Sequence, residues 1–159
     1  MLPSAMFKFR LEPLITIRSN VLKEQQAELA KAYDARRQIE ELQGQINEQL
    51  TVNENEGRKL MQPGQAVNVN HLLGLRQQEM FLRADYQQLS ERIKGIDEVI
   101  EMRRNAVMLA NRNLKIIEKL KEKRREKHRL EELRKESALM DEIAGQQAAD
   151  AGRQIAGSS

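Results

Sequence analysis

The chain has 159 residues, of which 32% are charged and 3% aromatic, and it contains neither cysteine nor tryptophan. Disulfides and thiolate chemistry are thereby excluded, and so few aromatic side chains cannot fill a thick globular core. A net charge of +3 is too small to argue for nucleic-acid binding by itself. No apolar run approaches the ~18 residues of a membrane-spanning helix, and residues 1–10 lack the apolar core of a signal peptide. One elongated, helix-rich domain is expected.

Residues 1–10 are predicted to form an N-terminal arm. Phe7 and Phe9, two of the three phenylalanines, flank Lys8 and precede Arg10. The arm has two interpretations: an ordered segment that packs on a neighbouring helix, or a hook that binds a partner. Pro13 then suits the first turn of a helix, where its missing N–H group costs nothing.

Residues 11–60 carry a seven-residue repeat that predicts the first helix. Its a and d positions, called here the first-helix ladder, are Leu11, Ile15, Arg18, Leu22, Gln25, Leu29, Ala32, Arg36, Ile39, Gln43, Ile46, Leu50, Asn53, Gly57 and Leu60. Nine of these fifteen residues are apolar, and polar residues at such positions cost stability but can fix register. Residues 52–57 are poor helix formers, so fraying is expected there.

Residues 61–70 are predicted to form the turn. Pro63 presets the first central residue of a type II turn, and Gly64 supplies the positive φ at the second. Asn68 or Asn70 can then cap the next helix.

The second helix, predicted over residues 71–145, carries the strongest pattern in the chain. Its second-helix ladder is Leu72, Leu75, Glu79, Leu82, Tyr86, Leu89, Ile93, Ile96, Ile100, Arg103, Val107, Ala110, Leu114 and Ile117. Only two of these fourteen residues are charged, and a stripe this regular can be buried only against another helix. The pattern favours a coiled coil over the core helix of a globular bundle.

Two heptad helices joined by a short turn predict an all-α antiparallel coiled-coil hairpin with a longer second helix, one domain over residues 11–145. With the turn centred near residue 65, the numbers of facing residues add up to about 130. Leu29 then meets Ile100, and Leu11 meets the chain near residue 119. Both ladders therefore end at the same level.

Residues 118–136 extend past the first helix and hold nine Lys or Arg and six Glu residues. Pairs such as Glu122–Arg125 and Glu126–Arg129 support a helix, whereas like charges four residues apart oppose it weakly. A solvated helix is the ordinary interpretation of such a run. We expect residues 118–144 to be partly frayed in the isolated protein, and residues 146–159 to form a disordered tail.

Three apolar residues lie off the second-helix ladder, at outward positions near the turn. Leu73, Met80 and Phe81 group with Gln77 and Ala84 at helical spacing. A grouped apolar surface indicates an interface. The alternative is lateral packing within a dimer of hairpins.

The residues give no support for catalysis. The two histidines, His71 and His128, lie far apart on the predicted helix, and no nucleophile–base set, HExxH or phosphate-binding glycine motif is present. Carboxylates on an open helix surface lack a pocket that would shift their pKa. We expect no enzyme, catalytic residue, metal site, cofactor or small-molecule ligand.

The opening Phe9-Arg10-Leu11-Glu12-Pro13-Leu14, followed by Arg18, resembles the start of the FliJ family of flagellar type III export proteins. The segment Glu131-Glu132-Leu133-Arg134-Lys135-Glu136, followed by Met140-Asp141-Glu142-Ile143-Ala144, is similar to the end of that family. Length and the two-helix plan match as well.

The resemblance implies a cytoplasmic subunit, peripherally associated with the inner membrane at the flagellar base and similar to the central stalk of rotary ATPases. Its implied partners are the hexameric export ATPase, the cytoplasmic domain of the export-gate membrane protein and export chaperones. The candidate ATPase contacts are Phe7, Phe9, Lys119, Lys123, Arg124, Arg125, Lys127, Leu130 and Leu133. The candidate gate or chaperone contacts are Leu73, Gln77, Met80, Phe81, Ala84 and Gln88.

Two other functions remain open from the residues alone. One is a structural coiled-coil spacer that forms a homodimer. The other is a nucleic-acid-binding helix that uses residues 119–135. The interleaved glutamates and the lack of aromatic residues in that segment argue against nucleic acid as a partner.

Overall fold

The computed structural model describes residues 6–64 and 66–158, and these residues form two long helices. Helix α1 spans Glu12–Leu60 and helix α2 spans Val69–Ala156. The predicted fold class is confirmed: the described residues are all-α, and the second helix is the longer one. Residues 1–5 of the predicted arm, residue 65 of the turn and residue 159 of the tail lie outside the described residues.

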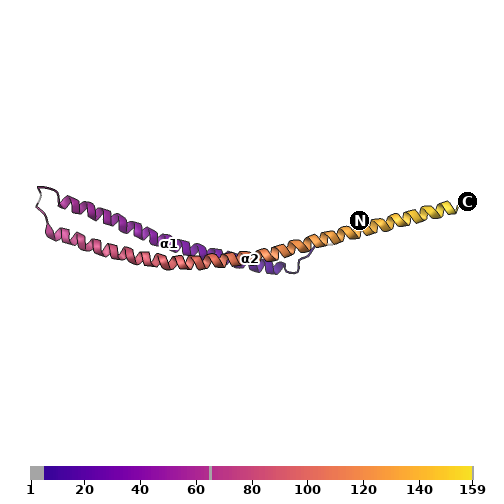
Figure 1. Ribbon diagram of the computed structural model, residues 1–159, viewed down its shortest axis with the longest axis horizontal. Helices are drawn as coiled ribbons and strands as arrows, with labels where there is room; N and C mark the ends of the chain where they lie inside the picture. Colours follow the sequence, from indigo (N-terminus) through magenta and orange to yellow (C-terminus); the bar gives the residue numbers. More distant parts are fainter. Residues whose placement is uncertain (1–5, 65, 159) are drawn as a thin grey trace. The chain divides into compact units, whose positions relative to one another are not determined.

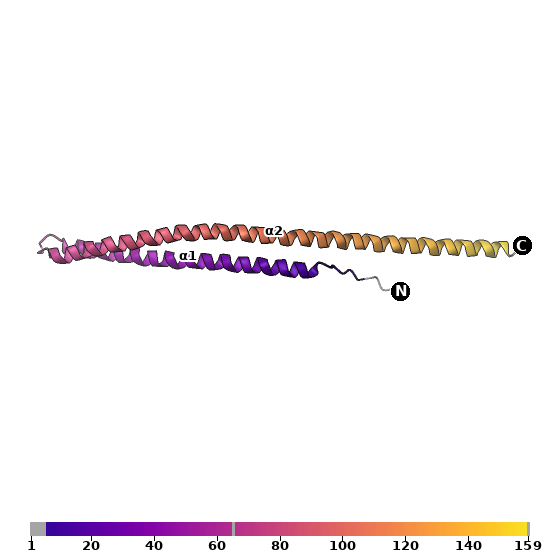
Figure 2. The same cartoon turned by 90° about the horizontal axis from the view of Figure 1, so that it is seen from below.

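The chain divides into two compact units. One unit is Val21–Ala110, and the other combines the residues up to Asn20 with those from Asn111 onward. In the Val21–Ala110 unit, α1 and α2 run antiparallel and side by side, joined by the turn (Figures 1 and 2). This unit is the predicted hairpin.

The heptad ladders account for the burial. No side chain of either ladder is fully exposed, and the most buried apolar ones in the hairpin unit are Leu75, Leu89, Ile100 and Ala110. Asn53 and Glu79, two polar ladder residues, are 2% and 7% exposed. The Asn53 Oδ1 atom accepts a hydrogen bond from Gln49, and Glu79 forms an ion pair with Arg76.

Contacts between the helices confirm the predicted register of the hairpin unit. Glu28 pairs with Arg103 at 3.8 Å, and the numbers of these two residues add up to 131. Arg36 Nε lies 2.8 Å from Asp97 Oδ1, a pair that adds up to 133. Both values are close to the expected sum, so the hairpin is aligned as its sequence predicts.

The ends of the hairpin turn follow local chemistry. Gly64 has a φ of 91°, a backbone conformation that residues with a side chain rarely adopt. Asn68 caps α2, because its Oδ1 atom accepts a hydrogen bond of 3.2 Å from the His71 backbone N–H. Pro13 lies in the first turn of α1, as expected.

The helices are more continuous in the structure than the sequence suggested. Residues 52–57 are helical and α1 ends only at Leu60, because packing of the first-helix ladder against α2, as at Gly57 beside Leu72, outweighs low helix propensity. Residues 118–144 are helical throughout. Helix α2 also continues past residue 145 to Ala156, where we expected a tail, because the segment is rich in alanine and glutamine, which favour the helix.

In the second unit, the first turns of α1 lie against α2. Arg18 Nη1 donates a hydrogen bond of 2.6 Å to the Asn113 carbonyl oxygen, and Lys121 pairs with Glu12 at 2.8 Å. Leu114 and Ile117, the last two ladder residues of α2, are buried at 9% and 6% exposure. This unit therefore has an apolar core of its own.

Candidate functional site

The described part of the arm, residues 6–10, packs on α2 in the second unit. Phe9 is buried at 8% exposure, and its carbonyl oxygen accepts a hydrogen bond of 3.1 Å from the Glu12 N–H group. The structure therefore shows the arm as an ordered segment that packs on a neighbouring helix. The residues that the arm brings together, called here the arm–helix cluster, are Phe7, Phe9, Glu12, Lys121, Arg124, Arg125 and His128.

Aromatic rings and guanidinium groups are paired within the arm–helix cluster. The Cζ atom of Arg124 lies 5.6 Å from the centroid of the Phe9 ring, and that of Arg125 lies 5.9 Å from the Phe7 ring centroid. The Phe7 ring also lies 5.6 Å from the His128 ring, centroid to centroid, at an interplanar angle of 56°. Each cation–π contact at an exposed site contributes about 0.5–1 kcal/mol, so burial of Phe9 is the larger stabilising contribution.

An open hollow of about 410 Å³ lies at the base of the cluster. Its lining is Phe7, Lys8, Phe9, Glu12, Lys121 and Arg125. Glu12, the only carboxylate in this lining, is held by Lys121 at 2.8 Å. The hollow therefore presents two further cationic groups, which makes it chemically suited to carboxylates rather than cations.

The other predicted ATPase contacts lie on the exposed surface of α2. Lys119, Lys123 and Lys127 follow each other at four-residue steps, and in the described chain none of them has an ion-pair partner. Leu130 and Leu133 are 43% and 47% exposed. The structure thus brings Phe7, Phe9 and the two arginines together, while the three lysines and two leucines remain free of that cluster.

Some of the predicted ion pairs along this part of α2 are present in the structure. Arg129 makes two hydrogen bonds to Glu126, of 2.6 and 3.1 Å, and these hydrogen bonds hold the pKa of Glu126 below its ordinary value. The predicted pair Glu122–Arg125 is longer, at 3.8 Å. Lys121 bridges to α1 rather than to a glutamate on its own helix.

The second predicted surface, called here the turn-proximal patch, lies on α2 in the hairpin unit. Leu73, Met80 and Phe81 are 61%, 72% and 64% exposed. The remaining members of the patch, Gln77, Ala84 and Gln88, are also exposed. These apolar side chains are not used in the hairpin core, so they are available to a partner.

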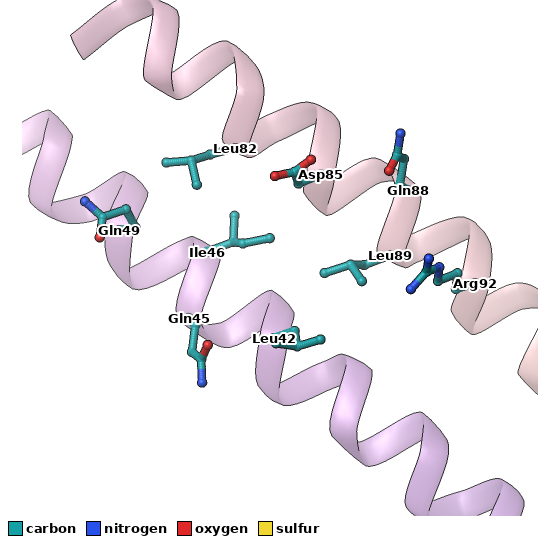
Figure 3. A pocket seen from close by; sticks show the side chains of 9 residues that line it. All are labelled: Leu42, Gln45, Ile46, Gln49, Leu82, Asp85, Gln88, Leu89 and Arg92. Carbon is teal, nitrogen blue, oxygen red and sulfur yellow. The ribbon is translucent and has the colours of Figure 1, made fainter. Parts of the chain in front are cut away.

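A groove between the two helices adjoins this patch at Gln88. It has a volume of about 420 Å³ and is lined by Leu42, Gln45, Ile46, Gln49, Leu82, Asp85, Gln88, Leu89 and Arg92. Figure 3 shows Ile46, Leu82 and Leu89 pointing into the space between the helices, while Gln45 points away from α2. The groove floor is therefore apolar and its rim polar.

Sequence reasoning assigned no role to four of the nine groove residues, Gln45, Gln49, Asp85 and Arg92. It placed Leu42 only beside the first-helix ladder, as a residue that widens it, although the register puts this part of α1 opposite residues 82–89 of α2. The hairpin register, combined with the outward position of Gln88, could have identified the α1 residues that face it.

The chain matches the model of a protein family described as the flagellar FliJ protein, over residues 7–153. This match covers nearly the whole sequence. The chain belongs to the FliJ family. No curated protein and no solved structure matches it.

Membership of the FliJ family makes this protein a component of flagellar protein export. The suspected resemblance is thereby confirmed. Neither helix has an apolar stretch that could cross a lipid bilayer, in the residues that the structure describes.

Proposed function

We propose that this FliJ-family protein acts without catalysis as a stalk or regulator of the flagellar export ATPase and links that ATPase to the export gate and its chaperones. In this proposal the ATPase hexamer contacts the arm–helix cluster and the basic surface of α2, which is formed by Lys119, Lys123 and Lys127. The cytoplasmic domain of the gate protein or a chaperone contacts the turn-proximal patch. The protein would work in the cytoplasm and reach the inner membrane only through the gate.

One observation carries the ATPase part of the proposal. Lys119, Lys123 and Lys127 form a row of like charges on one helical surface, and none of them forms an ion pair with a carboxylate of the described residues. Like charges at four-residue spacing destabilise a helix slightly. A row that costs stability in the free protein is best explained by an acidic partner surface that it attracts.

The gate or chaperone part rests on the turn-proximal patch and the groove beside it. Phe and Met side chains are enriched at protein interfaces, and here Met80 and Phe81 are more than half exposed. The apolar floor and polar rim of the groove have the arrangement of a protein-binding surface rather than of a catalytic pocket.

The test compares two triple variants that change the net charge equally. Lys119→Gln, Lys123→Gln and Lys127→Gln together should weaken binding to the purified export ATPase, reduce stimulation of ATP hydrolysis and flatten the salt dependence of binding. The control replaces Lys23, Lys31 and Lys59, all exposed lysines of α1, by Gln. Equal loss in both variants, or no loss in the first, would refute an ATPase contact on this surface.

A further inference from the structure

The arm is anchored to the same part of α2 that carries the basic residues. Phe9 is the most buried described residue of the arm, and Glu12, at the base of the arm, is tied to Lys121. The Phe7 ring contacts both Arg125 and His128, and His128 lies about one helical turn beyond Arg125 along α2. The arm therefore follows α2 along about two turns beyond the level where α1 begins.

The two phenylalanine rings attract the arginines without using up their hydrogen-bond donors. The Cζ atoms of Arg124 and Arg125 lie within about 6 Å of the ring centroids, a cation–π distance, and a guanidinium group keeps five N–H donors for other partners. Arg125 has one described carboxylate partner, Glu122 at the long distance of 3.8 Å. Arg124 has no ion-pair partner among the described residues.

Fixing these side chains matters for binding. A free arginine on a helix surface samples many rotamers, and binding a partner requires that this freedom be lost. An arginine already held near a ring loses less freedom, and its planar fork can then donate two parallel hydrogen bonds to a carboxylate.

We infer that the arm is a positioning element: Phe7 and Phe9 hold the guanidinium groups of Arg125 and Arg124 so that their N–H edges bind carboxylates of an acidic protein partner. This inference rests on the proposed ATPase contact and specifies how its basic surface is organised. It assigns the two phenylalanines an indirect role, through the arginines, rather than a direct contact.

If the arm instead covers the arginines, substitutions of its aromatic residues should change the binding affinity in the opposite direction. If the arm were a cover that hides the arginines, weakening its aromatic contacts would expose them and strengthen binding. The sign of the change in affinity therefore decides between a positioning element and a cover.

The experiment uses the full chain with two probes: the purified export ATPase and a fluorescently labelled oligoglutamate peptide. Phe7→Leu with Phe9→Leu keeps apolar bulk in the arm but removes both rings. We expect about tenfold weaker binding of both probes, the order that results when two flexible side chains must be immobilised on binding. Tyr33→Leu is the matched control, because it removes an equivalent contact with Arg104, at 6.0 Å, in the hairpin unit.

A second variant keeps the test valid if the leucine substitutions disturb the arm. Arg124→Lys with Arg125→Lys retains both charges and both rings but removes the planar forks. It should lose affinity to a similar extent, and adding the leucine substitutions should then cause little further loss, because the paired groups are coupled.

The outcomes separate this inference from the proposed function. Failure of the unaltered protein to bind the ATPase would overturn both. If the unaltered protein binds and the leucine and lysine variants bind equally well, the positioning role is wrong while the ATPase contact stands. Tighter binding by the leucine variant would also overturn the inference, since it would identify the arm as a cover.

Discussion

Gln43 on α1 and Ser90 on α2 are joined by a hydrogen bond of 2.9 Å, donated by Gln43 Nε2 to Ser90 Oγ. The Ser90 hydroxyl in turn donates to the Tyr86 carbonyl oxygen at 3.1 Å. Gln43 is a polar residue of the first-helix ladder, so this bond crosses the interface between the helices. Polar pairs at such positions select one register among those that apolar contacts alone would allow.

The stability of the hairpin should depend on the second-helix ladder. Ile100 is 6% exposed, and replacing it by Asp would place an unpaired charge between the helices, with an expected loss of about 3–5 kcal/mol in unfolding free energy. Glu101→Ala, at the exposed neighbouring position, should change it by less than ~0.5 kcal/mol. Urea denaturation followed by circular dichroism measures both, and similar midpoints would disprove the assigned register.

Gly57 offers a stabilising substitution. A Cβ atom at this position would lie 4.0 Å from Leu72 Cδ1, an ordinary contact distance. Gly57→Ala should therefore raise the unfolding free energy by about 1 kcal/mol, because alanine is the better helix former. Gly64→Ala should instead lower it, because φ is 91° there. Thermal melts of the two variants should move in opposite directions.

The turn-proximal patch should act in binding and not in folding. Met80→Ser with Phe81→Ser changes two side chains that are 72% and 64% exposed, so the melting temperature should stay nearly constant. Binding to the gate domain or to a chaperone should fall, while ATPase stimulation remains. A variant that loses both activities and keeps its fold would contradict the division of these roles.

The pair formed by Glu126 and Arg129 gives α2 a local pH dependence. Hydrogen bonding to Arg129 lowers the pKa of Glu126 in the helix, so the pair supports the helix above the ordinary glutamate pKa of about 4.3. This support disappears as the pH falls through the lowered pKa. Arg129→Gln should reduce helicity slightly at neutral pH, and the difference from the unaltered protein should vanish in acid. A difference in circular dichroism that persists at low pH would argue against the pair.

Heptad spacing was sufficient to predict most of the fold. Both ladders are buried or half-buried along their whole length, and the turn around Gly64 and the cap at Asn68 follow from local chemistry. These features depend on spacing along one helix or on neighbouring residues, so the sequence contains them directly.

The arm–helix cluster and the groove were harder to foresee. Phe7 and His128 are far apart in the sequence, and no periodicity links a short non-helical arm to a particular turn of α2. The groove depends on which flanking residues of two helices meet beside the ladders. Residues 52–57 were misjudged because helix propensity was weighed without the packing of Asn53 and Gly57.

The register of the Val21–Ala110 hairpin also restricts which insertions and deletions this part of the gene can accept. Each residue advances an α-helix by about 100°, so removing one residue from α1 alone would turn the ladder beyond it away from α2. Gln43 would then lose Ser90, and Arg36 would lose Asp97. Removing seven residues from each helix at matching levels would restore both ladders. Length variation among relatives should therefore occur in paired blocks of about seven residues, or at the turn around Gly64.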